Sequence, residues 1–515
     1  MEQLINGVHS GEGHVCERRD GNEEGSLIAA VEQVSITLDD YSSEQTFSPA
    51  GRIVPTPLLE NSNSSISTRC VLEEFTQCSK SHLWKLMMSF YDRKGPESWS
   101  HGIVPHFITC NAFIGRTYAK VLHGFLHDCA HNGRLDVKEP LYIIELGAGS
   151  GKFSFYMLRA LEELQEMCVF PFSKIVYVMT DFTEANFSFW RSHPSLKPYF
   201  ERGLLDAGIF DAVNDTTIKL WRSGITLQKD SCVNPICIVA NYLFDTLCHD
   251  IFQVDGGELK EGLISVGSRH ASEPDPLDPE IIQRLENLYC YRDISPDYYT
   301  NEEGDEASLS LLLNWYRENF KKTVSGASFL VPIGALRALR RLSSFSSGGT
   351  VVISGDKGNN SPEQFIGIAD PYIAVHGSFS LMVNYHAIGL WFTSRGGFAL
   401  HNPQEEASLK VSCFVLPSKS ETTDVVIDGT KLGAVAFLGD EIELLDEKRA
   451  EFYKFLRLNF REAVQMFGPN DYFGIMLSYL SCCIFIVLAI VVVLQKSLKE
   501  DVATPSLRAV VSMLK

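Results

Sequence analysis

An apolar run gives way to closely spaced glycines in the stretch LYIIELGAGSG, residues 141–151. Residues 141–145 are predicted to form a buried strand, and residues 152–167 have the apolar spacing of a helix. Glycine has no side chain and tolerates unusual backbone angles, so glycines between a strand and a helix permit a tight turn and close approach of a ligand. The stretch therefore predicts a ligand-binding turn built on Gly147, Gly149 and Gly151.

Three ligands compete for such a turn: a dinucleotide, a nucleoside triphosphate and S-adenosylmethionine (SAM). The glycine spacing misses the third glycine of the dinucleotide fingerprint by one residue. It also misses the P-loop pattern, because Phe153 stands where Ser or Thr should follow Lys152. Glu145 opens the turn and supplies negative charge, which suits SAM because its ammonium and sulfonium groups are both positive.

A second acidic residue, Asp181, follows the predicted strand at residues 174–180. A carboxylate at that position can accept hydrogen bonds from two ribose hydroxyls. Together with Glu145 it fits a nucleoside that carries a charged tail, which favours SAM as the cofactor. The alternative is a purely structural role for the turn and for Asp181.

Strands and helices alternate along the chain at a spacing typical of a parallel sheet with crossover helices. Asp255-Gly256-Gly257 predicts a hairpin turn between two further strands within residues 251–266. We therefore predict an α/β fold with a doubly wound, mostly parallel sheet. Later strands are predicted at residues 236–240, 350–354, 409–416 and 433–438, and a helix at residues 441–467.

Composition along the chain divides it into five parts. A disordered tail is expected first, because residues 1–69 are rich in Ser, Glu, Gly and Asn and have little hydrophobic periodicity. The full division is a tail at residues 1–69, a helical lead-in at 70–139, a core domain at 140–470 with a partly helical insertion over the active face at about 269–349, an apolar segment at 473–494 and a polar tail at 495–515.

The apolar segment, residues 473–494, contains no charged residue and is long enough as a helix to cross a hydrocarbon core of ~30 Å. We expect this C-terminal hydrophobic helix to act as a single-pass membrane anchor, with the catalytic domain in the cytosol. The alternatives are a buried core helix and a chain end that does not work as an anchor.

The overall charge and the scattered cysteines exclude other classes of partner. A formal charge of −19 argues against a nucleic-acid partner, because phosphate backbones are bound by Lys and Arg. The 13 cysteines show no metal-type pairing and suggest reduced thiols. His106, His376 and His386 also lack a metal-ligand spacing, so no metal is expected.

The turn and the positions after it resemble class I SAM-dependent methyltransferases. Glu145 to Gly151 is similar to their first motif, Asp181 to the acid after the second strand, and Asp211, preferred over Asp206, to the acid that reaches the adenine amino group. The resemblance implies a seven-stranded Rossmann-like sheet and SAM as cofactor.

More locally, the segment ANYLFDTL, residues 240–247, resembles MidA-like methyltransferases, a group that includes mitochondrial protein-arginine methyltransferases. Weaker similarity covers residues 84–467. The chain departs from that group at Tyr242, where Glu is usual, and at Cys248, where Pro is usual. The resemblance implies an arginine acceptor, and the two departures weaken that implication.

Methyl transfer requires the protein chiefly to align the acceptor with an already activated methyl group. A carboxylate that holds a cationic nitrogen and takes up its proton would help, which makes Asp245 and Asp356 the candidate catalytic residues. Asn241 would orient a ligand through its amide. The alternative is that Asp245 caps a helix and Asp356 forms a turn.

The sequence thus predicts a SAM-dependent methyltransferase whose acceptor is a protein side-chain nitrogen such as that of arginine. Two alternatives remain open. One is a SAM-binding assembly factor without turnover, and the other is a methyltransferase that acts on a small molecule at a membrane.

Overall fold

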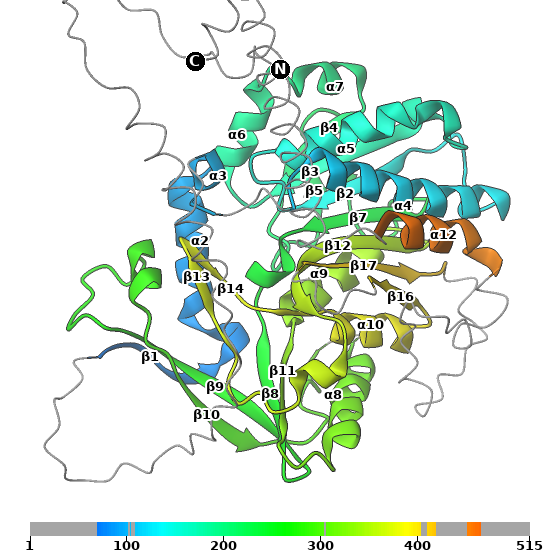
Figure 1. Cartoon of the computed structure of the whole chain (residues 1–515). Helices are drawn as coiled ribbons and strands as arrows, with labels where there is room; N and C mark the ends of the chain where they lie inside the picture. The colour runs from blue at the N-terminus through cyan, green and yellow to red at the C-terminus, as the bar shows by residue number, and fades with distance from the viewer. Residues whose placement is uncertain are drawn as a thin grey trace, which may run out of the picture. The chain divides into compact units, whose positions relative to one another are not determined.

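The computed structural model describes residues 69–100, 103–104, 109–302, 305–402, 409–418 and 451–464 (Figure 1). The predicted N-terminal tail up to residue 68, the strand predicted at 433–438, the apolar segment at 473–494 and the polar tail at 495–515 lie outside the described residues. Among the helices of the described part, none is both long enough and apolar enough to cross a membrane.

The predicted strand before the glycines is β2 (Leu141–Leu146), an interior strand of an eight-stranded sheet. Seven strands follow the order β16-β17-β12-β7-β2-β3-β4, and β15 pairs with β12 beside them. All pairs are parallel except those that β17 makes with β12 and β16. The other strands are β3 (Ile175–Asp181), β4 (Leu205–Ile209), β7 (Ile236–Asn241), β12 (Thr350–Asn359), β15 (Val383–Asn384), β16 (Phe398–His401) and β17 (Leu409–Leu416).

The prediction of a mostly parallel sheet is therefore confirmed, whereas the described sheet has eight strands instead of the expected seven. Among these strands, the two-residue β15 is too short to give an alternating pattern in the sequence.

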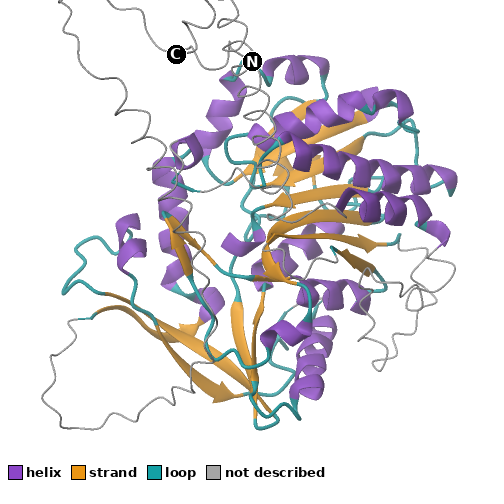
Figure 2. Ribbon diagram, in the orientation of Figure 1, coloured by secondary structure: helices purple, strands orange, loops and turns teal. Residues whose placement is uncertain are grey.

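Helices cover both faces of this sheet (Figure 2). Alternation within β2 shows the two faces directly: Leu141 and Ile143 pack into one apolar core, while Tyr142 and Ile144 pack into the other. One face carries α4 (Ala112–His131), α5 (Lys152–Glu163), α6 (Glu184–Ser192), α7 (Lys197–Arg202) and α12 (Lys454–Val464). The other carries α2 (His82–Lys94), α8 (Glu306–Phe320), α9 (Ile333–Ser343) and α10 (Tyr385–Ser394).

A second, antiparallel sheet of five strands lies beside the second core. It consists of β1 (Cys70–Gln77), β8 (Asp250–Asp255), β9 (Glu258–Ser268), β10 (Leu288–Asp293) and β11 (Ala327–Val331). The predicted hairpin at residues 255–257 is confirmed, because β8 and β9 pair around Gly256 and Gly257, both with positive φ. Shorter elements are α3 (Glu97–Ser100), β5 (Ile218–Lys219), β6 (Thr226–Leu227), β13 (Ala374–His376) and β14 (Ser378–Ser380).

Two expectations about the regions around the core require correction. The lead-in at residues 70–139 does not begin as a helix, because β1 precedes α2 and pairs with β9, a strand far away in the sequence. The insertion contains α8 and α9, but it also supplies β10 and β11 to the antiparallel sheet.

The site positions follow from the parallel strands of the main sheet. The carboxyl ends of β2, β3, β4 and β7 meet at one edge, where parallel α/β sheets bind ligands. This edge carries the glycine turn after β2, Asp181 at the end of β3 and Asn241 at the end of β7.

Candidate active site

The glycine turn has the backbone that the sequence predicts. Gly147, Gly149 and Gly151 have φ values of 64°, 52° and 73°, a region that glycine adopts without strain. A Cβ at Gly147 would lie 2.7 Å from Leu243, one at Gly149 would lie 2.9 Å from Trp99, and one at Gly151 would lie 2.7 Å from Met179. The turn is therefore a close-fitting cradle that larger residues would fill.

Glu145 is buried at the start of this turn, with 2% of its surface exposed. Its Oε2 accepts hydrogen bonds from the hydroxyl of Ser154 and, at 2.8 Å, from that of Tyr177. Burial raises the pKa of Glu145 to about 7, although both hydroxyl donors lower it and the charge of Asp181 adds to the rise. The carboxyl thus titrates near neutral pH, where a cationic ligand would favour its ionised form.

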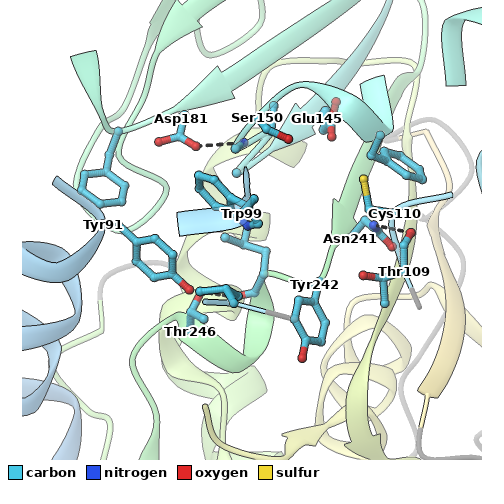
Figure 3. A pocket seen from close by; sticks show the side chains of 17 residues that line it. Tyr91, Trp99, Thr109, Cys110, Glu145, Ser150, Asp181, Asn241, Tyr242 and Thr246 are labelled. Atoms are coloured by element: carbon cyan, nitrogen blue, oxygen red, sulfur yellow. Dashed lines mark hydrogen bonds between the residues drawn. The ribbon is translucent and has the colours of Figure 1, made fainter. Parts of the chain in front are cut away.

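Asp181 links the end of β3 to the glycine turn (Figure 3). Its Oδ2 accepts a hydrogen bond of 3.1 Å from the N–H of Gly149, and its Oδ1 accepts two bonds of 3.0 Å from the N–H and hydroxyl of Thr183. Burial raises the pKa of Asp181, and these donors oppose the rise. The carboxylate is therefore fixed at the place where the sequence predicts a ribose contact.

Two neighbouring cavities open at this edge of the sheet, with volumes of about 100 Å³ and 270 Å³. The smaller cavity is lined by Glu145, Gly147, Gly149, Asp181 and Asn241, so the structure brings these predicted residues together. Gly151 does not line it and instead packs against Met179. Residues shared by the two cavities are Tyr91, Gly147, Asp181, Phe182, Leu243 and Thr246.

The larger cavity contains Asp211, in the loop after β4. Its Oδ1 accepts from the N–H of Val213 at 2.8 Å, and its Oδ2 accepts from the side-chain amide of Asn214 at 2.8 Å. The rival residue Asp206 is fully buried and bonds to the N–H groups of Arg222 and Ser223, which is a structural role. Asp211 lines the larger cavity and Asp206 lines neither cavity, while the role of Asp211 toward adenine stays a prediction.

Asn241 is held on both sides of its amide. Its Oδ1 accepts from the hydroxyl of Tyr118 at 3.1 Å, and its Nδ2 donates to the carbonyl of Thr109 at 3.0 Å. The next residue, Tyr242, has a φ of 57°, which a residue with a side chain adopts rarely. Such backbone conformations occur where the surrounding structure enforces them, often at functional sites.

Asp245 and Asp356 lie together, but neither lines either of these two cavities. Both side chains are fully buried. Oδ2 of Asp356 accepts a hydrogen bond of 3.1 Å from the N–H of Asp245, in a short 3-10 helix at Phe244–Thr246. Burial raises the pKa of Asp245 to about 7 and that of Asp356 well above its usual range, and the Lys357 charge opposes both shifts.

Several site residues have no motif that marks them in the sequence. The smaller cavity is also lined by Tyr91, Trp99, Phe182 and Cys110, contributed by segments before and beside the glycine turn. Periodicity predicted helices near Tyr91 but gave no sign of which ring would reach the turn. Within the described ranges, no group of three His, Cys, Asp or Glu residues is placed to hold a metal.

Comparison with known proteins supports SAM as the ligand of this site. Residues 126–354 match the model of a family described as "Putative S-adenosyl-L-methionine-dependent methyltransferase". This range includes the glycine turn, Asp181, Asp211 and the Asn241 segment. The match supports a methyltransferase enzyme with SAM as its cofactor, which the close-fitting cradle and the two nearby carboxyl groups can accommodate. No curated protein matches the sequence.

Solved structures show weak similarity. A superfamily member from Burkholderia thailandensis bound to S-adenosyl-homocysteine is 11% identical, with a TM-score of 0.39 over 76% of this chain and 84% of that one. A SAM-dependent methyltransferase from Aquifex aeolicus is 9% identical, with a TM-score of 0.23 over 62% and 97% of the two chains. At these TM-scores, neither similarity bears on the fold or the acceptor.

Proposed function

We propose that the chain transfers the methyl group of SAM to an acceptor nitrogen, with an arginine side chain of a protein as the first candidate. Methyl transfer is supported by the cradle of Gly147 and Gly149 at the carboxyl edge of the sheet. The N–H of Gly149 donates a hydrogen bond to Asp181 there. SAM supplies a methyl group that a positively charged sulfur already activates. The residues of the chain therefore have to bind and align the two reactants.

The acceptor is proposed to enter beside Asn241 and Tyr242, which line the smaller cavity together with the glycine turn. Asn241 is the candidate contact residue, because Tyr118 and Thr109 fix its amide. Asp245 and Asp356 act as positioning residues in this proposal, since their bond fixes the segment that follows Tyr242. The pKa of Asp245, which burial raises to about 7, also suits a group that takes up a proton near neutral pH, and this supports a nitrogen acceptor.

A second candidate is a small-molecule acceptor, and one observation favours it. Five aromatic side chains line the smaller cavity: Tyr91, Trp99, Phe153, Phe182 and Tyr242. Apolar and aromatic walls with few polar groups are typical of small-molecule sites. This candidate shares the cofactor site with the first and differs only in the acceptor.

Incubation of the full chain with methyl-labelled SAM and cell lysate separates these possibilities. Label recovered in protein, and released as methylarginine on hydrolysis, supports the first candidate. Label in the lipid or small-molecule fraction replaces it with the second. SAM binding without transfer to any fraction would instead favour a non-catalytic assembly factor.

The Gly149→Val variant gives the background in the same lysate. A β-branched side chain at that position would meet Trp99, so the variant should bind no SAM and transfer no label. Equal labelling by the variant and the natural chain would show that other proteins in the lysate produce the signal.

A further inference from the structure

Trp99 lies over the glycine turn, although it belongs to a segment that is distant from the turn in the sequence. It belongs to α3, which follows α2 after Gly95. Gly95 packs against Ala185, since a Cβ added to it would lie 2.9 Å from the Cβ of Ala185. The N–H of Val104 donates to the carbonyl of Ser98 at 2.9 Å, which holds the other side of Trp99.

The contact between Trp99 and the turn is direct. Three atoms of its benzenoid ring would lie 2.9 to 3.1 Å from a Cβ at Gly149, so the absence of a side chain there lets the indole pack on the backbone. Tyr91 stacks on Trp99, with ring centroids 5.7 Å apart and planes 21° apart. The two rings form an aromatic pair that lines the smaller cavity beside Gly149 (Figure 3).

The charged groups of this cavity are already engaged. The acids among its described lining residues are Glu145, which accepts from Ser154 and Tyr177, and Asp181, which accepts from Gly149 and Thr183. No Lys or Arg belongs to the described lining. A fixed positive charge that enters the cavity therefore meets the aromatic rings of Trp99 and Tyr91 beside carboxyl groups that are already hydrogen-bonded within the fold.

We infer that Trp99, supported by Tyr91, is a specificity-determining residue that recognises the positively charged sulfur of SAM through a cation–π interaction. The attraction between a cation and an indole face depends on the ligand's charge. The demethylated product has a neutral sulfur, so Trp99 favours SAM over this product. The inference rests on the proposed methyltransferase function and adds to it the residue that distinguishes substrate from product.

Equilibrium binding of SAM and of S-adenosyl-homocysteine to the full chain tests this inference. Trp99→Leu should weaken SAM binding about five- to thirtyfold while changing the affinity for S-adenosyl-homocysteine less than about twofold. Trp99→Phe retains a π face, so its affinity for SAM should lie between those of the natural chain and of Trp99→Leu. The ratio of the two affinities is the quantity to compare.

Trp221→Leu is the matched control, because Trp221 is 42% exposed and lines neither cavity. It should leave the affinity ratio unchanged. Equal losses for both ligands in Trp99→Leu, or a loss in Trp99→Phe as large as in Trp99→Leu, would overturn the inference and leave only a packing role. A natural chain that binds neither ligand would overturn the proposed function itself.

Discussion

Oδ2 of Asp356, within β12, accepts a hydrogen bond of 3.1 Å from the backbone N–H of Asp245, in the 3-10 helix that follows the neighbouring parallel strand β7. The two residues are 111 positions apart in the sequence. Their bond fixes the backbone between Tyr242 and Thr246, where the chain leaves β7 and borders both cavities. The buried carboxyl group of Asp356 thus fixes the backbone that borders the proposed acceptor site.

Asp245→Asn should lower turnover about tenfold or more while the affinity for SAM stays within about twofold. The substitution keeps the side chain's size but removes a carboxyl whose pKa burial raises to about 7, so it removes the negative charge and proton uptake without opening a cavity. Single-turnover rates and calorimetric SAM binding measure the two effects separately. Unchanged turnover would assign Asp245 a structural role and direct attention to Asp356.

Asp128→Asn controls for the general effect of replacing a buried carboxylate. Asp128 accepts from the N–H groups of Phe455 and Leu456 and lines neither cavity. This variant should lower the melting temperature without changing turnover at a temperature where it remains folded. A similar loss of turnover in both variants would mean that destabilisation explains the result for Asp245.

Asp181→Ala should weaken SAM binding by ~1 to 3 kcal/mol, because it removes an acceptor at the proposed ribose contact and frees the N–H of Gly149. Gly149→Val should abolish binding. Gly224→Val is its matched control: Gly224 also has positive φ, at 71°, but an added Cβ there meets nothing within 4 Å. If SAM binds normally to Asp181→Ala and Gly149→Val, the cofactor does not occupy this turn.

The pKa of Glu145 predicts opposite effects of pH on folding and on cofactor binding. Burial raises this pKa from 4.5 to about 7, so the folded chain keeps a proton that the unfolded chain loses between these values. Stability should therefore fall as pH rises through this window, by at most about 3 kcal/mol from this residue. SAM affinity should rise over the same window, because the cationic cofactor favours the ionised carboxylate.

Comparison with Glu145→Gln isolates this group, because Gln can still accept from Ser154 and Tyr177 but does not titrate. Urea unfolding at pH 5 should give similar stabilities for the two proteins, whereas at pH 8 the variant should be the more stable. A difference of the opposite sign at pH 8 would show that the ionised Glu145 is stabilised within the fold.

The sequence predicted the glycine turn because its determinants are local. Three glycines spaced between a strand and a helix leave few other backbone solutions, and each of the three has the positive φ that a tight turn requires. Asp181 was predicted for a similar reason, since the end of β3 must meet the end of β2 in a parallel sheet. Local spacing and strand order were sufficient for both.

Other features depend on contacts that no local pattern records. β1 has an irregular burial pattern and two shifts of register against β9, so its residues show no regular alternation. Trp99 reaches Gly149 only because α3 is anchored at Gly95 and Ser98. The sequence named Asp245 and Asp356 as candidate residues, but their complete burial depends on how the surrounding elements pack.

The apolar run at residues 473–494 lies outside the described residues, and its role as a membrane anchor stays a prediction from the sequence. A reporter fused to residues 473–515 should sediment with membranes and resist carbonate extraction, because 22 residues without charge meet the length requirement of a spanning helix. Ile486→Asp places a charge near the middle of the run, where it costs ~3 kcal/mol, and should return part of the reporter to the soluble fraction. The same experiment on the full chain decides whether the segment anchors the enzyme. Recovery of the full chain without detergent, together with a soluble reporter, would contradict the anchor and favour a helix that packs against protein.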